Sequence, residues 1–236
     1  MLSQKEAESV GFDAIQSSFL RKISQAAIFN TMRILKRINP GDCYLENYLG
    51  HLQKSGEDFY DTYMLLWEIS AVRAPKKILE IGTRTGISLC QLLSGYIDNS
   101  IIRKVVCIDP FADGYTSPAL VRRNLNYLNL PGEMPEIITG FSQDVLPNFS
   151  RKEEDLFDYI LVDGDHEKEA ARKDLEAAHQ LLGGGGVIVF DDISDAPGEC
   201  ALIDVWEAFV TEHGAKYETG KNMSGKGVAW AIKLEE

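Results

Sequence analysis

Three aspartates at the ends of two apolar runs have the residue type and placement to do chemistry. Asp163 follows the run Phe157–Val162, and Asp191 and Asp192 follow the run Val187–Phe190. If these runs are adjacent strands of a parallel sheet, the carboxylates converge at one edge. Carboxylates held close raise one another's pKa unless a cation lies among them, and Mg²⁺ prefers oxygen ligands. The pattern predicts a site for Mg²⁺ or another divalent cation; the alternative is a set of solvated strand-end aspartates.

A histidine lies close to the first of these aspartates. His166 comes three residues after Asp163, on the side of the sheet where the ligand is expected. Because imidazole titrates near neutral pH, His166 is suited to take a proton from a hydroxyl. Its alternative role is to cap or pack the first turn of a helix. His51, His179 and His213 have no comparable neighbours, and we expect His179 to be structural.

A glycine-punctuated turn can bind a nucleotide-like ligand. The segment Lys77–Gly86 reads KILEIGTRTG, in which a strand, Lys77–Ile81, breaks at Gly82 and a helix, Ile87–Gly95, follows Gly86. Glycines let the backbone approach a ligand, and the helix offers free N–H groups there. The E-x-G-x-x-x-G spacing favours S-adenosylmethionine over NAD. The alternative is a turn with a structural role alone.

Polar residues also follow the second and third predicted strands. Asp109 ends the strand Val105–Ile108, where a carboxylate can accept hydrogen bonds from both ribose hydroxyls of a nucleoside. Ser142 and Gln143 follow the third strand and can bond the edge of an adenine ring. The alternatives are a loop aspartate before Pro110 and a simple turn with a helix cap.

Strands and helices alternate along the chain in the order that these residues require. The strands are expected at Lys77–Ile81, Val105–Ile108, Ile137–Thr139, Phe157–Val162, Val187–Phe190, Lys216–Thr219 and Gly227–Lys233. The helices are expected at Phe59–Ala71, Ile87–Gly95, Ser117–Leu128, Glu167–Leu182, the last with Asp165 as its N-cap, and Ala201–Thr211. This alternation predicts an α/β fold: a doubly wound, Rossmann-like, mostly parallel sheet of seven strands. The last two strands lie too close together for a helical crossover, so they should pair as an antiparallel hairpin.

The length of 236 residues suits one α/β domain with an extension. We expect a helical extension, a cap or dimer arm, over residues 1–55, and the main domain over residues 56–236. Within the extension, Ala14–Lys36 has the apolar spacing of an amphipathic helix. Such a helix is compatible with a homodimer.

The net charge and the pattern of cysteines limit which binding partners and which cellular compartment we expect for this chain. A net charge of −12 disfavours a nucleic-acid partner. No apolar run approaches the roughly 18 residues of a membrane span, and the N-terminus lacks the apolar core of a signal peptide. Cys43, Cys90, Cys107 and Cys200 are scattered and read as reduced, mostly packed thiols. A cytoplasmic enzyme without a membrane partner is therefore expected.

From Phe59 to Lys233 the chain resembles the class I S-adenosylmethionine-dependent O-methyltransferases. It is most similar to the Mg²⁺-dependent catechol and caffeoyl-CoA type and to the macrolide-sugar (macrocin-type) enzymes. The resemblance rests on the blocks EIGTRTGIS, CIDP, GFSQDVLP, and VDGDH with VFDD. It implies a methionine site at Glu80, Gly82, Thr83, Gly86 and Ser88, a ribose site at Asp109, an adenine site at Ser142 and Gln143, and a metal site at Asp163, Asp191 and Asp192. Arg84 belongs to the cofactor-binding set as well. Asp163 also joins the cofactor-binding set.

Two departures from the catechol type bear on the substrate. Catechol-type enzymes usually carry a lysine where this chain has His166, and Asp-Asn where it has Asp191-Asp192. Histidine at this position is similar to the macrolide-sugar branch, in which it is taken to be the general base. The resemblance therefore shifts the expected acceptor from a phenol toward an alcohol or sugar hydroxyl.

Together these features predict metal-assisted methyl transfer from S-adenosylmethionine to a hydroxyl of a small molecule. One alternative is a metal-independent methyltransferase acting on another acceptor. A second is a catalytically idle module that binds S-adenosylmethionine without consuming it. A nucleotide-dependent oxidoreductase is disfavoured by the glycine spacing and by the closing hairpin.

Overall fold

The structure is a computed structural model, and it describes Leu66, Ile69 and residues 73–93, 99–125, 130–223 and 225–235. The predicted extension at residues 1–55 lies outside the described residues. So does most of the predicted helix Phe59–Ala71, of which Leu66 and Ile69 are helical and buried. No helix in the described ranges is long and apolar enough to cross a membrane.

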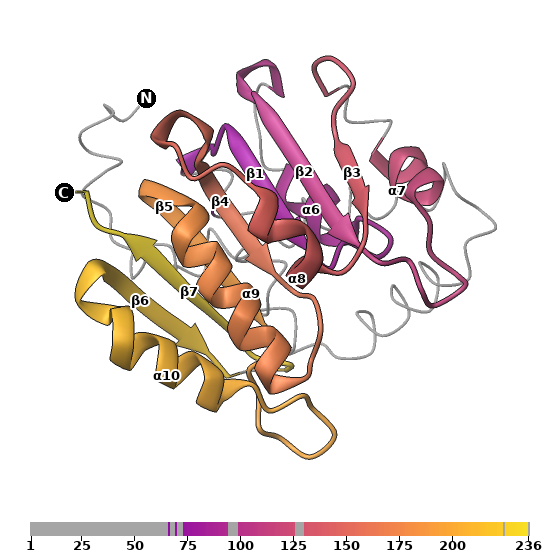
Figure 1. Ribbon diagram of the computed structural model, residues 1–236. Helices are drawn as coiled ribbons and strands as arrows, with labels where there is room; N and C mark the ends of the chain where they lie inside the picture. Colours follow the sequence, from indigo (N-terminus) through magenta and orange to yellow (C-terminus); the bar gives the residue numbers. More distant parts are fainter. Residues whose placement is uncertain are drawn as a thin grey trace, which may run out of the picture.

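A single seven-stranded sheet carries the described part of the chain, in the order β3-β2-β1-β4-β5-β7-β6 (Figure 1). Strand β7 is antiparallel to both of its neighbours, β5 and β6, whereas the pairs among β1 to β5 are parallel. The strands are β1 (Lys77–Ile81), β2 (Lys104–Asp109), β3 (Glu136–Thr139), β4 (Phe157–Val162), β5 (Leu182–Asp191), β6 (Tyr217–Asn222) and β7 (Val228–Lys233). The predicted fold class and the closing hairpin are confirmed.

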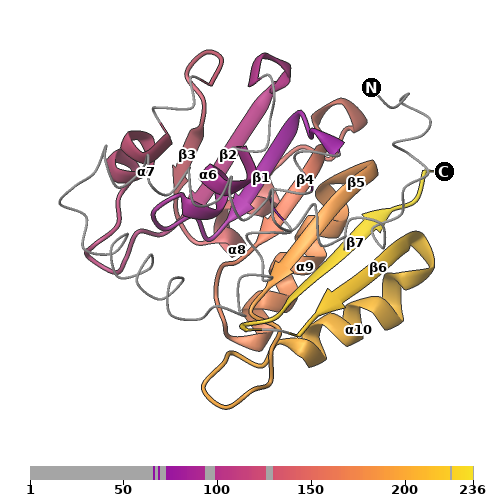
Figure 2. The ribbon, with the colours of Figure 1, turned by 180° about the vertical axis from the view of Figure 1, so that it is seen from behind.

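Helices cover both faces of this sheet (Figures 1 and 2). One face carries α6 (Ile87–Leu93) and α7 (Pro118–Leu125), and the other carries α8 (Ser142–Val145), α9 (Lys168–Leu181) and α10 (Ile203–His213). Short 3₁₀ turns occupy Asn99–Ile101, Leu146–Asn148, Glu153–Asp155 and Gly214–Lys216. The result is a three-layer sandwich in which the ligand edge of the sheet stays accessible.

The central strands are apolar on both faces because helices cover both. In β1, Ile78 packs with the α6 side, whereas Leu79 and Ile81 pack with the α9 side. Successive side chains of a strand point to opposite faces, so each strand feeds both cores. Cys90 and Cys107 are buried and Cys200 is partly exposed, and none of the three forms a disulfide. The expectation of packed thiols is confirmed for Cys90 and Cys107; Cys43 lies outside the described residues.

Strand β5 begins earlier than predicted. The expected strand Val187–Phe190 followed four glycines, but β5 starts at Leu182 and includes them. Its pairing with β4 is irregular between Phe157 and Tyr159, and glycines can follow such an irregularity because they lack a Cβ.

The start of α9 also differs from the prediction. Its N-cap position is Glu167, without a side-chain cap hydrogen bond, and the helix begins at Lys168. The Asp165 carboxylate instead accepts a hydrogen bond from the Glu167 N–H at 3.0 Å. The prediction of Asp165 as the N-cap is therefore wrong by two positions, because its side chain closes the turn before the helix.

Candidate functional site

The carboxyl ends of the parallel strands bring most of the predicted site residues to one edge of the sheet. A cavity of about 360 Å³ lies at this edge, between the residues that follow β1, β2, β3 and β4. Its lining includes Gly82, Arg84, Asp109, Ser142, Gln143, Asp163 and His166. Residues far apart in the sequence thus share one pocket, as the strand order requires.

Backbone contacts build the β1 end of this cavity. The Gly82 N–H donates to the Ile108 carbonyl at 2.9 Å, and the Asp163 N–H donates to the Ile81 carbonyl at 2.9 Å. Gly82 has φ +88°, and a Cβ there would lie 1.7 Å from the Asp163 carbonyl oxygen. Only glycine fits at this position, so the turn after β1 and the end of β4 are locked together.

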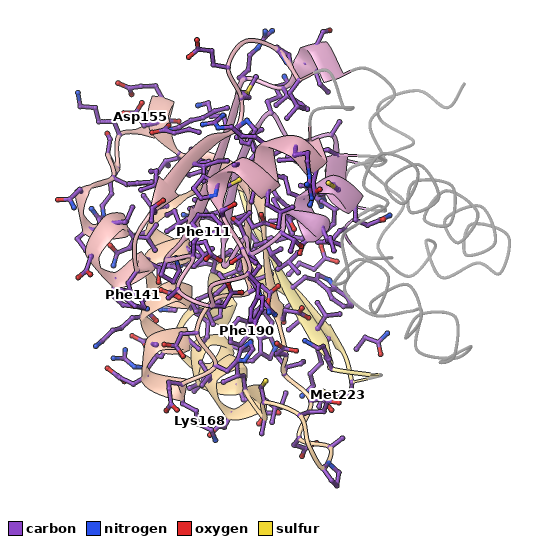
Figure 3. The ribbon with its side chains drawn as sticks, turned by 90° about the vertical axis from the view of Figure 1, so that its right-hand side faces the viewer. Phe111, Phe141, Asp155, Lys168, Phe190 and Met223 are labelled. Atoms are coloured by element: carbon purple, nitrogen blue, oxygen red, sulfur yellow. The ribbon has the colours of Figure 1, made fainter. Side chains whose placement is uncertain are left out.

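Asp109 holds the neighbouring turns through its carboxylate. Oδ2 accepts from the Arg84 N–H at 2.8 Å, and Oδ1 accepts from the N–H of Phe111, labelled in Figure 3, at 2.6 Å. A carboxylate has about four acceptor positions, so Asp109 keeps capacity for ligand hydroxyls at the cavity wall. The Arg84 guanidinium lies 3.9 Å from the Asp113 carboxylate, and both residues line the cavity.

Four of the residues predicted to bind the methionine part lie behind the turn. Glu80, Thr83 and Ser88 are buried, and none of them, nor Gly86, lines the described cavity. Burial raises the pKa of the Glu80 carboxyl to about 8, against the lowering effect of the nearby Thr83 hydroxyl. Gly86, with φ +77°, donates its N–H to the Thr83 carbonyl at 2.7 Å and closes the turn. These four residues support the turn from the side away from the cavity, whereas Gly82 and Arg84 line the cavity.

A buried aspartate that the sequence analysis missed supports the predicted adenine residues. Gln143 donates through Nε2 to Asp174 Oδ1 at 3.1 Å, and burial raises the pKa of Asp174 to about 6. Asp174 lies in α9 on the stripe formed by Ala171 and Ala178, which are buried. A carboxylate at helical spacing within an apolar stripe was the signal that could have identified it. Asp174 fixes the orientation of Gln143 at the cavity wall.

The three aspartates predicted to bind metal converge at the ends of β4 and β5. Asp163, Asp191 and Asp192 each offer a carboxylate oxygen, and these oxygens all lie within 4.8 Å of one another. Burial, together with the charges of Asp191 and Asp192, raises the pKa of Asp163 well above its ordinary value. The donor set fits a hard divalent cation, because all three ligands are carboxylate oxygens. We refer to these three residues as the aspartate cluster.

His166 pairs directly with the aspartate cluster. Its Nε2 lies 2.8 Å from Asp192 Oδ2, and this hydrogen bond raises the pKa of His166 above its ordinary value. Asp192 is almost fully buried and has the left-handed backbone conformation, with φ +59°. His166 also lines the cavity, so its imidazole lies between the pocket and the aspartates.

A lysine that no sequence motif indicated completes this charged group. Lys226 lies in the turn between β6 and β7, and its Nζ is 3.0 Å from Asp192 Oδ1. Although burial works the other way, the Asp192 carboxylate raises the pKa of Lys226, which therefore stays charged. Cys200 lies nearby and offers a sulfur within 4.8 Å of His166 and Asp192 ligand atoms. Both residues come from segments after β5 that carry no recognisable pattern.

The remaining described histidines, His179 and His213, lie away from the cavity and have partners of their own. The rings of His179 and His213 stack with centroids 4.1 Å apart, and His179 Nδ1 lies 2.7 Å from the Tyr217 hydroxyl. His213 Nε2 lies 2.9 Å from Glu176. Burial lowers the pKa of His179 to about 4, so it packs as a neutral ring. These partners come from α9, α10 and β6, and sequence spacing could not bring them together.

Comparison with known families identifies a large part of the described chain. Residues 79–193 match a family model described as a methyltransferase domain. The uncharacterized protein R132 of Acanthamoeba polyphaga mimivirus is 28% identical over 119 residues, which cover 50% of this chain and 51% of that protein. The chain thus spans about half the length of that curated relative.

Solved structures show the same fold. An O-methyltransferase from Bacillus cereus, in complex with SAH, has a TM-score of 0.59 and 19% identity, covering 86% of this chain and 91% of that one. The O-methyltransferase TomG from Streptomyces achromogenes, in complex with SAM, has a TM-score of 0.54 and 19% identity, covering 72% and 78%. A Staphylococcus aureus protein provisionally named a caffeoyl-CoA O-methyltransferase has a TM-score of 0.57 and 20% identity, covering 87% and 99%. The predicted resemblance is confirmed, in sequence for the methyltransferase domain and in structure for the fold.

Proposed function

We propose that this chain, which carries a methyltransferase domain over residues 79–193, transfers a methyl group from S-adenosylmethionine to a hydroxyl oxygen of a small molecule with the help of a divalent cation. The observation that carries the proposal is the position of Asp163. This residue lines the cavity at the ends of β1 to β4 and also belongs to the aspartate cluster. A ligand in the cavity and an acceptor at the aspartates would therefore be neighbours.

The chain's own groups suit the two ends of a nucleoside-type cofactor. The Gly82 turn leaves room for close approach, and Asp109 would accept the ribose hydroxyls. Ser142 and Gln143, the latter held by Asp174, would bond the adenine edge. S-adenosylmethionine, when bound, supplies a methyl group on a positively charged sulfur. Holding donor and acceptor in line is the main way in which the protein would accelerate such a transfer.

The aspartate cluster would hold the divalent cation through Asp163, Asp191 and Asp192. When bound, such a cation acts as a Lewis acid that lowers the pKa of a hydroxyl and orients its oxygen. His166 would take the hydroxyl proton as a neutral imidazole, once its Nε2, which lies 2.8 Å from Asp192 Oδ2, has turned from that carboxylate to the acceptor. The Asp192 carboxylate would hold the imidazole in the cavity wall until the acceptor arrives. The polarity of this end favours an alcohol, sugar or phenol hydroxyl as the acceptor.

The experiment that tests the proposal follows S-adenosylhomocysteine formation with a panel of catechols, sugars and aliphatic alcohols. Turnover with at least one acceptor is expected. It should be lost in EDTA and restored by excess Mg²⁺, while S-adenosylhomocysteine binding, measured by calorimetry, stays unchanged. Full activity in EDTA would remove the cation from the proposal, and absence of cofactor binding would remove the proposal as a whole.

One observation favours a second candidate, a metal-independent methyltransferase. The Lys226 ammonium already lies 3.0 Å from Asp192 Oδ1 and supplies positive charge to the aspartate cluster. The EDTA experiment separates the two candidates directly. A small-molecule acceptor, the absence of a nucleic-acid partner, a homodimer and a cytoplasmic location remain predictions.

A further inference from the structure

Lys226 is fixed in place by the backbone around it. The Ser194 N–H donates to the Lys226 carbonyl at 2.7 Å, and the Ile193 N–H donates to the Gly227 carbonyl at 3.2 Å. Gly227 has φ +76°, and a Cβ there would lie 2.7 Å from the Ser194 nitrogen. The β6–β7 turn is therefore bound tightly to the segment that follows the aspartates. The Lys226 side chain therefore extends toward the aspartate cluster from a backbone position that these hydrogen bonds hold.

Two nitrogen-bearing side chains, those of Lys226 and His166, lie beside the Asp192 carboxylate. Asp192 Oδ1 lies 3.0 Å from Lys226 Nζ, and Oδ2 lies 2.8 Å from His166 Nε2. The ammonium also attracts the carboxylates of Asp163 and Asp191. Buried carboxylates at this spacing repel one another, and a cation among them offsets that repulsion. In this structure the protein supplies such a cation from its own sequence.

The pair with Asp192 differs from the other lysine pairs of the same region. Lys221, in β6 of the same hairpin, lies 2.9 Å from Glu207, and both of those side chains are exposed. Ion pairs between two exposed side chains contribute little to the stability of a protein, whereas a charge beside a buried carboxylate strongly affects the energy of that carboxylate. The Lys226 side chain is 59% exposed, like that of Lys221, but the Asp192 side chain is only 2% exposed, so the two pairs differ in the burial of the carboxylate. Lys221 therefore provides a matched control for Lys226.

We infer that Lys226 is the resident cation of the aspartate cluster and competes with a divalent metal ion for Asp192, so that it sets the metal affinity of the site. The inference rests on the metal site of the proposed function. The Lys226 ammonium and a divalent cation would share the Asp192 carboxylate, and like charges at this distance repel each other strongly. Metal binding would require the lysine side chain to swing away from the carboxylate while its backbone stays anchored.

The first test compares Mn²⁺ affinity in K226M, K221M and the wild-type protein, by electron paramagnetic resonance of free Mn²⁺ and by calorimetry. Methionine keeps much of the length of lysine but removes its charge. K226M is expected to bind Mn²⁺ at least about tenfold more tightly than the wild type, whereas K221M should match the wild type. Equal or weaker binding by K226M, or no Mn²⁺ binding by either protein, overturns the inference.

The second test measures thermal unfolding of the same proteins. In EDTA, K226M should unfold at a lower temperature than K221M, because its aspartates have lost their cation. Saturating Mn²⁺ should remove this difference. If K226M does not fold, K226R provides the alternative variant: it keeps the positive charge, so its Mn²⁺ affinity should stay close to that of the wild type. Tenfold tighter binding by K226R would contradict the inference.

These outcomes are separable from those of the proposed function. If K226M shows unchanged metal affinity while wild-type turnover needs Mg²⁺, the inference fails and the proposed function stands. If K226M binds Mn²⁺ more tightly while no variant binds S-adenosylhomocysteine in calorimetry, the inference stands and the proposed function fails.

Discussion

The two halves of the ligand edge are built in different ways. Around β1 and β2, backbone groups make the site: the Asp109 carboxylate is held by the N–H groups of Arg84 and Phe111, and Gly82 meets the Asp163 carbonyl. Around β4 and β5, side chains make it, since Asp192 is held by the charged ends of His166 and Lys226. We call these the cofactor half and the acceptor half.

This difference indicates which amino-acid substitutions each half tolerates. A site made of backbone depends on conformation, so it is sensitive to a glycine and indifferent to many side chains. A site made of charged side chains depends on having positive and negative groups close together. Removing the positive partner therefore leaves buried carboxylates that repel one another. The following predictions test this contrast, from the largest effect to the smallest.

Gly82→Ala should disrupt the cofactor half most severely. Its Cβ would lie 1.7 Å from the Asp163 carbonyl oxygen, a clash that flexible side chains cannot relieve. We expect a loss of more than about 3 kcal/mol in the free energy of unfolding, or a fall of roughly 10 °C in the unfolding temperature. Thermal unfolding and S-adenosylhomocysteine binding measure the effect.

Gly114→Ala is the matched control for this change. Gly114 has φ +75°, close to the +88° of Gly82, but no atom lies within 4 Å of the position of its Cβ. It should cost only about 1 kcal/mol, the cost of the backbone conformation. Equal losses in the two variants would show that conformation alone, without the close approach, governs the turn.

His166→Ala should damage the acceptor half without disturbing the cofactor half. The turnover rate is expected to fall roughly 10²- to 10⁴-fold, the usual contribution of a general base. S-adenosylhomocysteine affinity and the KM for the acceptor should change little. Steady-state kinetics with calorimetry measures the split, and an unchanged rate would return His166 to a packing role.

Glu80→Gln should change how stability depends on pH. The pKa of Glu80 is about 8 in the folded protein against an ordinary 4.5, so between these values the folded protein holds one more proton than the unfolded chain. Its contribution to the free energy of unfolding therefore falls as pH rises through this range, in total by a few kcal/mol on the order expected for such a shift. Urea unfolding at pH 5 and pH 9 should show that E80Q gains stability relative to the wild type at the higher pH. The same difference at both pH values would contradict a buried, protonated Glu80.

Arg84→Ala should have the smallest effect. Arg84 contributes its backbone N–H to Asp109, whereas its exposed side chain lies 3.9 Å from Asp113. Removing such an exposed pair should change cofactor affinity by less than about threefold. A much larger loss, measured by calorimetry with S-adenosylhomocysteine, would mean that the guanidinium binds the cofactor directly and that the cofactor half depends on side chains after all.

The sequence was most informative where a local pattern determines the structure. Apolar runs of strand length located β1, β2 and β4, and the parallel arrangement then brought Asp109 and Asp163 to one edge. The same reasoning brought Asp191 and Asp192 together with Asp163. Strand order and the strand-end position of each residue were sufficient for these predictions.

Tertiary contacts between distant segments could not be predicted in this way. Lys226 reaches Asp192 across 34 positions in the sequence, and Asp174 reaches Gln143 across 31. Nothing local marks Lys226, and the apolar stripe of α9 that marks Asp174 as buried does not indicate its partner. Glu80 belonged to the right motif, but its position on β1 alone did not reveal that its side chain is buried behind the turn.

The place of β7 in the sheet has a consequence for synthesis on the ribosome. Strand β7 inserts between β5 and β6, although it follows β6 in the sequence. Until it emerges, β5 is an unpaired edge, and such edges can pair with other chains. The nascent chain can assemble the cofactor half early, while the aspartates at the end of β5 wait for the turn that carries Lys226. The pairing of β7 therefore covers the open edge of β5, and the turn before it brings Lys226 to Asp192.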